Sequence, residues 1–272
     1  MDTDIVLPEG AFKRCPSCGQ LISQCDRSQY LYALDKWDTA DGTNPASGAV
    51  RRHAEVSRRR LTAIRRLLAS AASPVRLLDV GCSSGALLRV ATRLGFDAEG
   101  VEPAARAVET ARQNGLRVHR GLLHEQHFAD GYFHAITMFE LIEHLPEPLA
   151  VLHECSRILC AGGVLAVSTP NAASWTAKIM GARWENFDLI KRGGHISFFN
   201  PRSIRLAAQR GGMVVERIET RGVRFFEKGE LPSALHSIAK LGSELLNVPS
   251  QLAGRGHDML VFMRKRSSGT ER

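Results

Sequence analysis

The chain has 272 residues, of which 44% are hydrophobic and 24% are charged, and its formal net charge is +8. This length and composition are typical of one globular α/β domain with extensions. No apolar run approaches the roughly 18 residues that a membrane span needs, and the acidic stretch at 1–10 lacks the apolar core of a secretory signal. We therefore expect a cytoplasmic protein.

The first 49 residues differ in composition from the rest, and we expect them to form a separate N-terminal segment. They contain the motif C-P-S-C-G at 15–19, then Cys25, and a polar linker near 41–48. Two cysteines at this spacing, followed by glycine, make half of a zinc-knuckle site. Cys15, Cys18 and Cys25 are therefore candidate zinc ligands, although a fourth ligand is not evident. A thioredoxin-like redox role is disfavoured, because no βαβ pattern surrounds the pair.

From residue 50 onward, apolar and polar segments alternate as strands and helices do. The expected elements, in chain order, are helix 50–70, strand 75–80, helix 86–94, strand 98–101, helix 104–113, strand 116–119, strand 133–139, helix 149–159, strand 164–168, helix 201–210, strand 213–218 and strand 259–263. Glycines near 162 are expected to end the helix over 149–159. A helical insertion is expected at about 225–254. This alternation predicts a Rossmann-like, doubly wound, mostly parallel seven-stranded sheet over 50–272.

A glycine-rich turn, 81–85, follows the strand over 75–80. Gly81 and Gly85 allow the backbone to approach a ligand where a β-carbon would clash. One βα unit later, Glu102 ends the next strand, where a carboxylate can bind both hydroxyls of a ribose. The spacing differs from a dinucleotide fingerprint, and no P-loop lysine follows. The turn and Glu102 together predict a nucleoside-bearing cofactor, and the alternative is an ordinary βα turn.

A second polar cluster follows the strand over 133–139. Glu140, Glu143 and His144 have the spacing E-x-x-E-H. In a helical turn, Glu140 would share one face with the other two side chains. These residue types could hold a divalent ion such as Mg²⁺. The alternative is that Glu143 and His144 form hydrogen bonds to the loop backbone.

These motifs resemble those of class I S-adenosylmethionine (SAM)-dependent methyltransferases, of the ubiquinone-biosynthesis type and the type 11 and type 23 groups. The resemblance rests on D-V-G-C-S-S-G at 79–85, G-V-E-P at 100–103 and E-x-x-E-H-x-x-x-P at 140–148, and covers about half of the chain. It implies SAM as the cofactor and an antiparallel last strand. Some similar enzymes use Mg²⁺ at the E-x-x-E-H segment, and many do not.

The resemblance also implies which residues contact SAM. The turn 81–85 would hold the methionine part, Glu102 the ribose, and the backbone near Phe139 the amino group. Similar enzymes commonly carry an acid near 121–123 for adenine, so here the Leu122 backbone or His124 must supply that contact. The implied cofactor residues are Asp79, Gly81, Cys82, Ser83, Gly85, Glu102, Leu122, Phe139 and Glu140.

Methyl transfer to a hydroxyl requires a group that takes the proton. His195 is the first candidate, because it lies in the long connection 172–199 that should cover the acceptor, and His144 is the second. The alternative is that His195 only holds this loop in place. Trp175, Trp184 and Phe187 either line an acceptor pocket or form a small local core.

The predicted function is methyl transfer from SAM to a small-molecule or glycan acceptor, with a hydroxyl oxygen as the favoured acceptor atom. The basic net charge leaves an RNA methyltransferase as an alternative. Nucleic acid is nevertheless a disfavoured partner, because no basic patch with interleaved aromatic residues accompanies the charge. A third alternative is a catalytically silent SAM-binding subunit.

Overall fold

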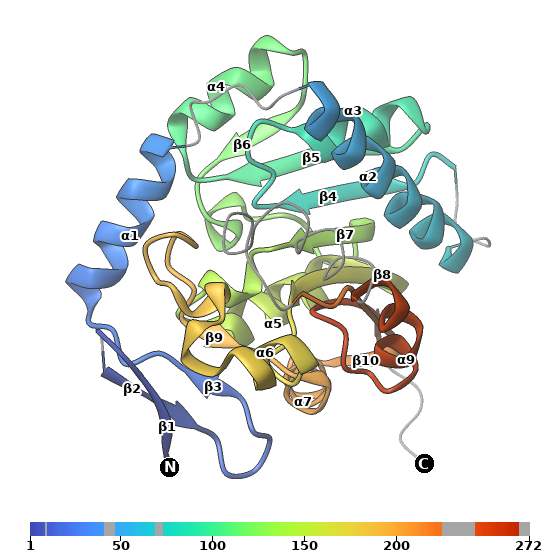
Figure 1. Cartoon of the computed structure of the whole chain (residues 1–272). Helices are drawn as coiled ribbons and strands as arrows, with labels where there is room; N and C mark the ends of the chain where they lie inside the picture. Colours follow the sequence, from blue (N-terminus) through green and yellow to red (C-terminus); the bar gives the residue numbers. More distant parts are fainter. Residues whose placement is uncertain (9, 41–46, 69–72, 225–242, 267–272) are drawn as a thin grey trace.

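The computed structural model describes residues 1–8, 10–40, 47–68, 73–224 and 243–266. Its centre is a seven-stranded sheet in the order β10-β11-β8-β7-β4-β5-β6 (Figure 1). The pairs among β4 to β8 are parallel, and β11 is antiparallel to both of its neighbours. The predicted fold class and the antiparallel last strand are confirmed. The strands are β4 (Arg76–Val80), β5 (Asp97–Glu102), β6 (Val118–Arg120), β7 (Phe133–Phe139), β8 (Leu159–Pro170), β10 (Met213–Arg221) and β11 (Asp258–Lys265).

Helices cover both faces of this sheet, which explains why its central strands are apolar throughout. Leu77 and Leu78 in β4 are fully buried in separate clusters, since successive strand residues point to opposite faces. The Leu77 cluster includes residues of α2 (Ser47–Leu67), α3 (Ala86–Arg93) and α4 (Ala105–Gln113). The Leu78 cluster includes residues of α5 (Pro148–Ile158) and α7 (Pro201–Arg210). β4 and β7 therefore lie where the connections turn to opposite faces, the usual ligand position in such sheets.

The strand expected over 164–168 begins earlier than predicted. β8 starts at Leu159, immediately after α5, and no glycine cap separates the two elements. Phe133 pairs with Leu159 and Ala135 with Val164, so the intervening β8 residues bulge out of register with β7. Gly162 has φ +73° inside this bulge. The glycines thus serve a bulged strand start, because pairing with β7 extends β8 backward.

The N-terminal strands form a second, antiparallel sheet with a strand from the long connection. β1 (Asp2–Leu7), β2 (Gly10–Arg14) and β3 (Leu21–Ile22) precede α1 (Arg27–Ala40), and β3 pairs with β9 (Ser197–Phe198). Phe12 packs against Phe187 and Phe198, with ring centroids 4.8 and 5.1 Å away. Trp184 and Phe187 are buried in this cluster, which confirms the small-core alternative for both. The connection also contains α6 (Trp175–Met180), η3 (Gly181–Arg183) and η4 (Glu185–Phe187).

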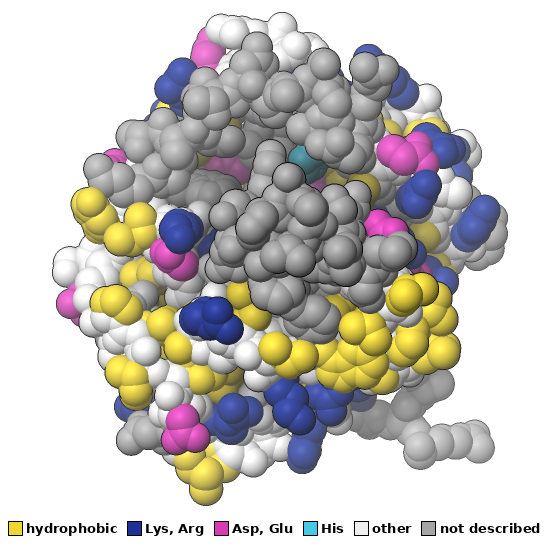
Figure 2. Space-filling model, in the orientation of Figure 1, with side chains coloured by type: hydrophobic (Ala, Val, Ile, Leu, Met, Phe, Trp, Pro, Cys, Tyr) yellow, Lys and Arg dark blue, Asp and Glu magenta, His cyan; other side chains and the backbone are white. Residues whose placement is uncertain are grey.

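Most of the expected helical insertion, 225–242, lies outside the described residues. Its described end contains α9 (Asn247–Leu252). In the part of the chain that is described, no helix is both long and apolar enough to cross a membrane. Lys and Arg side chains are scattered over the face in Figure 2, with acidic side chains among them.

Candidate active site

The glycine-rich turn joins β4 to α3 at the carboxyl edge of the sheet. Gly81 (φ +73°) and Gly85 (φ +79°) adopt the left-handed conformation that favours glycine. The N–H groups of Gly81 and Cys82 donate to the carbonyl of Val101 in β5, at 2.9 and 3.2 Å. A β-carbon at Gly85 would collide with Cδ1 of Leu116. The turn is therefore held against β5 in a conformation that depends on its two glycines.

Glu102 is the last residue of β5, and its carboxylate faces the glycine turn. Its Oε2 accepts a hydrogen bond from the Ser83 N–H at 2.9 Å, and its Oε1 accepts one from the Ala104 N–H at 3.0 Å. Two backbone donors fix the orientation of the carboxylate. A carboxylate at the end of the second strand is the usual partner of a ribose in nucleotide-binding sheets.

Asp79 lies in β4, two residues before the turn, and is buried. Its Oδ1 accepts a hydrogen bond from the Thr137 hydroxyl of β7 at 2.6 Å. Burial raises the pKa of Asp79 to about 7, although the Thr137 hydrogen bond opposes this shift. The Asp79 side chain therefore joins the two central strands beneath the turn.

β7 ends in a sharp turn at Glu140. The backbone of Glu140 has φ +52°, a left-handed conformation that residues other than glycine rarely adopt. Its N–H donates to the Ser168 carbonyl at 2.9 Å, and its Oε1 accepts from the Ser168 hydroxyl at 2.6 Å. The Glu140 side chain is thereby directed to β8. The chain then continues into the short 3-10 turn η2 (Ile142–His144).

Arg60 is a site residue that the sequence analysis did not single out. It extends from α2, and its guanidinium carbon lies 4.4 Å from the centroid of the Phe139 ring. Burial lowers the pKa of Arg60, while the carboxylates of Glu140 and Asp258 raise it, and an arginine stays charged in proteins. A partly buried cation thus lies at the end of β7. One feature of the sequence could have indicated its inward position. Arg60 precedes the buried Ile64 by one helical turn, so the two residues share one face of α2.

Glu143 and His144 of η2 meet His195, which comes from the long connection. Possible ligand atoms of these three side chains lie within 4.8 Å of one another. Nδ1 of His144 lies 2.8 Å from the Gly193 carbonyl oxygen, and Nδ1 of His195 lies 3.2 Å from that of Asn186. Because a carbonyl oxygen only accepts, both histidines carry their proton on Nδ1. Each Nε2 is therefore an acceptor.

Burial determines the electrostatics of this cluster. It raises the pKa of Glu143 well above the ordinary value and lowers the pKa of His195 to about 3. Glu143 is 1% exposed, and neither of its oxygens has a well-formed hydrogen bond to the described residues. Its Oε1 lies 3.8 Å from Nε2 of His195. An unprotonated imidazole nitrogen thus lies beside a buried carboxyl group.

Comparison with known proteins decides the family. Residues 51–218 match a family model described as a methyltransferase domain. The chain belongs to this family. It is a class I SAM-dependent methyltransferase (EC 2.1.1), distantly related to the ubiquinone biosynthesis O-methyltransferases. The family predicted from the motifs is confirmed, and membership implies SAM as the cofactor.

The relatives match only part of their own length. The methyltransferase is 36% identical over 132 residues to the ubiquinone biosynthesis O-methyltransferase of Xanthomonas oryzae pv. oryzae, covering 44% of this chain and 54% of the relative. For the enzyme of that name from Thiobacillus denitrificans, the identity is 29% over 154 residues, covering 53% and 66%. The chain therefore spans less than two thirds of the length of these relatives.

Solved structures of low identity share the fold. A putative sarcosine dimethylglycine methyltransferase from Galdieria sulphuraria is 19% identical, with a TM-score of 0.57 over 88% of this chain and 98% of that one. A SAM-dependent methyltransferase from Archaeoglobus fulgidus is 17% identical, with a TM-score of 0.54 over 77% and 94%. At such identities the likeness shows the fold alone.

Of the three expected magnesium ligands, the structure brings Glu143 and His144 together, with His195 in place of Glu140. The left-handed turn at Glu140 sends its side chain to Ser168, and His195 takes its place in the cluster. One carboxylate and two imidazoles do not make a magnesium site, because Mg²⁺ prefers oxygen ligands in octahedral geometry. This donor set does not favour magnesium, and binding by the three expected ligands stays a prediction.

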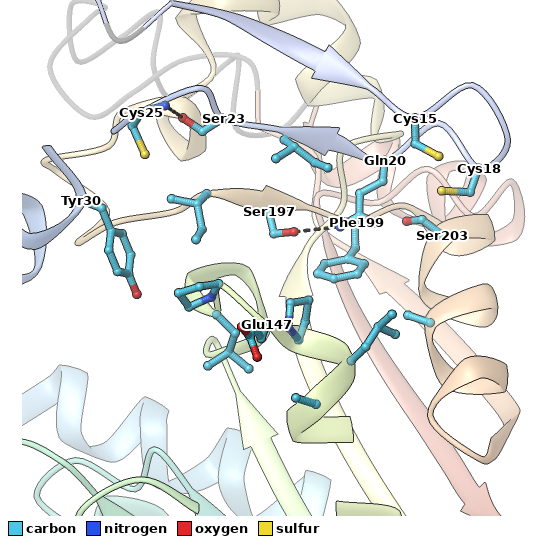
Figure 3. Close-up of a pocket in the computed structure, with 18 of the residues that line it drawn as sticks. Cys15, Cys18, Gln20, Ser23, Cys25, Tyr30, Glu147, Ser197, Phe199 and Ser203 are labelled. Carbon is cyan, nitrogen blue, oxygen red and sulfur yellow. Dashed lines mark hydrogen bonds between the residues drawn. The ribbon is translucent and has the colours of Figure 1, made fainter. Parts of the chain in front are cut away.

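Among the described residues, the expected zinc ligands Cys15, Cys18 and Cys25 do not gather at one point, and zinc binding by them stays a prediction. All three cysteines line a cavity of about 930 Å³ between the N-terminal segment, α5 and α7. Figure 3 shows Cys15 and Cys18 at one end of this cavity and Cys25 at the other. The strand β3 lies between them and carries Cys25 away, because extended chain rises about 3.3 Å per residue.

The Leu122 backbone, which was expected to contact adenine, already forms hydrogen bonds within the protein. The Leu122 N–H donates to Oε2 of Glu125 at 2.6 Å, and the Leu122 carbonyl accepts from Nε2 of Gln126 at 3.0 Å. Both backbone groups are thus used at the start of η1 (Leu123–Gln126), whereas the Leu122 side chain is half exposed. A role of Leu122 or His124 in adenine binding stays a prediction.

Proposed function

We propose that this methyltransferase transfers the methyl group of SAM to a hydroxyl oxygen of a small-molecule or glycan acceptor, with His195 as the base. The observation that carries the proposal is the buried pair of His195 and Glu143, 3.8 Å apart. A neutral imidazole with a free Nε2 can take a hydroxyl proton, and an adjacent carboxylate stabilises the imidazolium that results. His144 is the second candidate for the base, but the Glu143 oxygen Oε1 lies beside Nε2 of His195.

The cofactor would bind along the carboxyl edge of β4 and β5. We assign the ribose hydroxyls to Glu102, the methionine part to the turn 81–85, and its amino group to the backbone near Phe139. The partly buried guanidinium of Arg60 is the available partner for the methionine carboxylate, since arginine binds carboxylates strongly. Asp79 supports the turn from below.

The reaction is an in-line displacement at carbon, so alignment provides much of the acceleration. SAM, when bound, would supply the methyl group, leaving as S-adenosylhomocysteine, and Nε2 of His195 would take the proton of the acceptor hydroxyl. The positive charge leaves the sulfonium and arises on the imidazole beside Glu143. Burial favours the protonated form of Glu143, so its ionisation would depend on the positive charge that arises on His195.

Two variants and an acceptor screen test this function. We expect His195→Gln and Glu143→Gln to slow methyl transfer about 10²- to 10⁴-fold while the dissociation constant of SAM changes less than about twofold. His119→Gln is the matched control, because His119 pairs with Glu99 on β5. The acceptor is identified by incubating the enzyme with labelled SAM and fractionated cell extract. Full activity of both variants, or label found only in RNA, would refute the proposal.

A further inference from the structure

A tight turn places two cysteines side by side at one end of the 930 Å³ cavity. The turn connects β2 to β3, which pair through Arg14 and Leu21. The Cys15 N–H donates to the Gln20 carbonyl at 2.9 Å, and the Gly19 N–H donates to the Cys15 carbonyl at 2.9 Å. Gly19 has φ +72°, which closes the turn. Both thiols are reduced here, and Figure 3 shows the two sulfur atoms turned toward each other.

The two thiols differ in exposure and in surroundings. Sγ of Cys15 is accessible at the cavity edge and lies 3.1 Å from the Ser17 hydroxyl, whereas Cys18 is 7% exposed. An accessible thiol next to a buried thiol, both on one tight turn, is the arrangement of an attacking and a resolving cysteine.

We propose that Cys15 and Cys18 form a redox-active modification site, which closes to a disulfide by exchange with a small disulfide such as oxidised glutathione. The Cys15 thiolate attacks one sulfur of glutathione disulfide, giving a mixed disulfide and one glutathione thiolate. The Cys18 thiol loses its proton and attacks Sγ of Cys15, which releases the second glutathione. The cysteine pair loses two electrons and two protons in total, and the glutathione disulfide gains both.

The turn is tied to the segment that carries His195. The Gln20 side-chain amide donates to the Ser197 hydroxyl at 2.7 Å, and the Asn200 amide donates to the Cys18 carbonyl at 3.1 Å. Asn200 also accepts from the first N–H groups of α7. The Cys15–Cys18 site is therefore linked through β3 and β9 to the segment of His195. Its thiol chemistry does not depend on the assignment of His195 as the base.

The test uses the full chain, freed of metal by a chelator, in mixtures of reduced and oxidised glutathione. Thiols are then trapped by alkylation and peptides are analysed by mass spectrometry. We expect a Cys15–Cys18 linked peptide whose yield follows the glutathione ratio and is reversed by reduction. Cys18→Ser should stop at a mixed disulfide on Cys15, and Cys15→Ser should give neither product. Cys25→Ser, in the same cavity, is the matched control and should behave as the wild type.

Three outcomes would overturn the proposal. The first is the absence of a linked peptide at every glutathione ratio. The second is equal modification of Cys18 in the Cys15→Ser variant, which would remove the distinction between attacking and resolving thiol. The third is stoichiometric zinc in the protein before chelation, with both thiols unreactive until the metal is removed, because the pair would then be a metal site.

Discussion

The buried carboxyl group of Asp79 makes a specific prediction about stability. Its pKa is about 7 in the folded protein, against about 3.9 in an unfolded chain. Between these two pH values the folded state binds more protons than the unfolded state, so the free energy of unfolding must fall as the pH rises. At 1.36 kcal/mol per pKa unit, a difference of about 3 units corresponds to roughly 4 kcal/mol. Asp79→Asn removes this loss, while the amide oxygen can still accept from Thr137.

We therefore expect Asp79→Asn to match the wild type near pH 4 and to exceed it in stability above pH 7, by up to about 4 kcal/mol. Urea unfolding of both proteins without SAM, from pH 4.5 to 8.5, measures the difference directly. Other titrating groups contribute equally to both proteins and cancel. Thr137→Val is the companion variant. Since the Thr137 hydroxyl holds the Asp79 pKa down, its loss should extend the decline to higher pH. Parallel pH profiles for wild type and Asp79→Asn would refute the reasoning.

Two further predictions concern residues proposed to hold SAM, and a third concerns magnesium. Glu102→Gln should weaken SAM binding about 10- to 100-fold, the value of a hydrogen bond to a charged group. Glu99→Gln in the same strand is the control and should bind SAM as the wild type does. Titration calorimetry measures both affinities, and equal affinities of the two variants would contradict the assignment of the ribose to Glu102. Gly85→Ala should destabilise the fold and weaken SAM binding, because Cδ1 of Leu116 must move aside and φ is +79°, while Gly115→Ala, with a similar φ (+73°) and open space, should cost only about 1 kcal/mol. Chelation followed by Mg²⁺ addition should leave transfer rates unchanged, and a magnesium-dependent rate would contradict our interpretation of the donor set.

The strands and the cofactor turn were predictable because their signals are local. An apolar run, two glycines at fixed spacing and an acid at the end of the next strand lie within one βα unit of sequence. Each has a direct physical cause, in burial on both faces or in the left-handed conformation of Gly81 and Gly85. The observed bounds of β7 equal the expected range, and those of β4 and β5 differ from it by at most one residue at either end.

The chemistry of the second cluster depended on contacts between distant parts of the chain. Helical spacing placed Glu140 with Glu143 and His144, but the hydrogen bonds to Ser168 hold Glu140 in a left-handed turn away from both. The long connection has no repeating pattern from which the approach of His195 could be read.

By itself, the sequence determined the fold class, the family and the glycine-rich turn, since these depend on neighbouring residues. Only the tertiary structure decided which side chains meet around Glu143, that Arg60 lies over the Phe139 ring, and that β9 completes the N-terminal sheet. Those contacts arise from burial and pairing between segments far apart in the chain, for which spacing along the sequence carries no information.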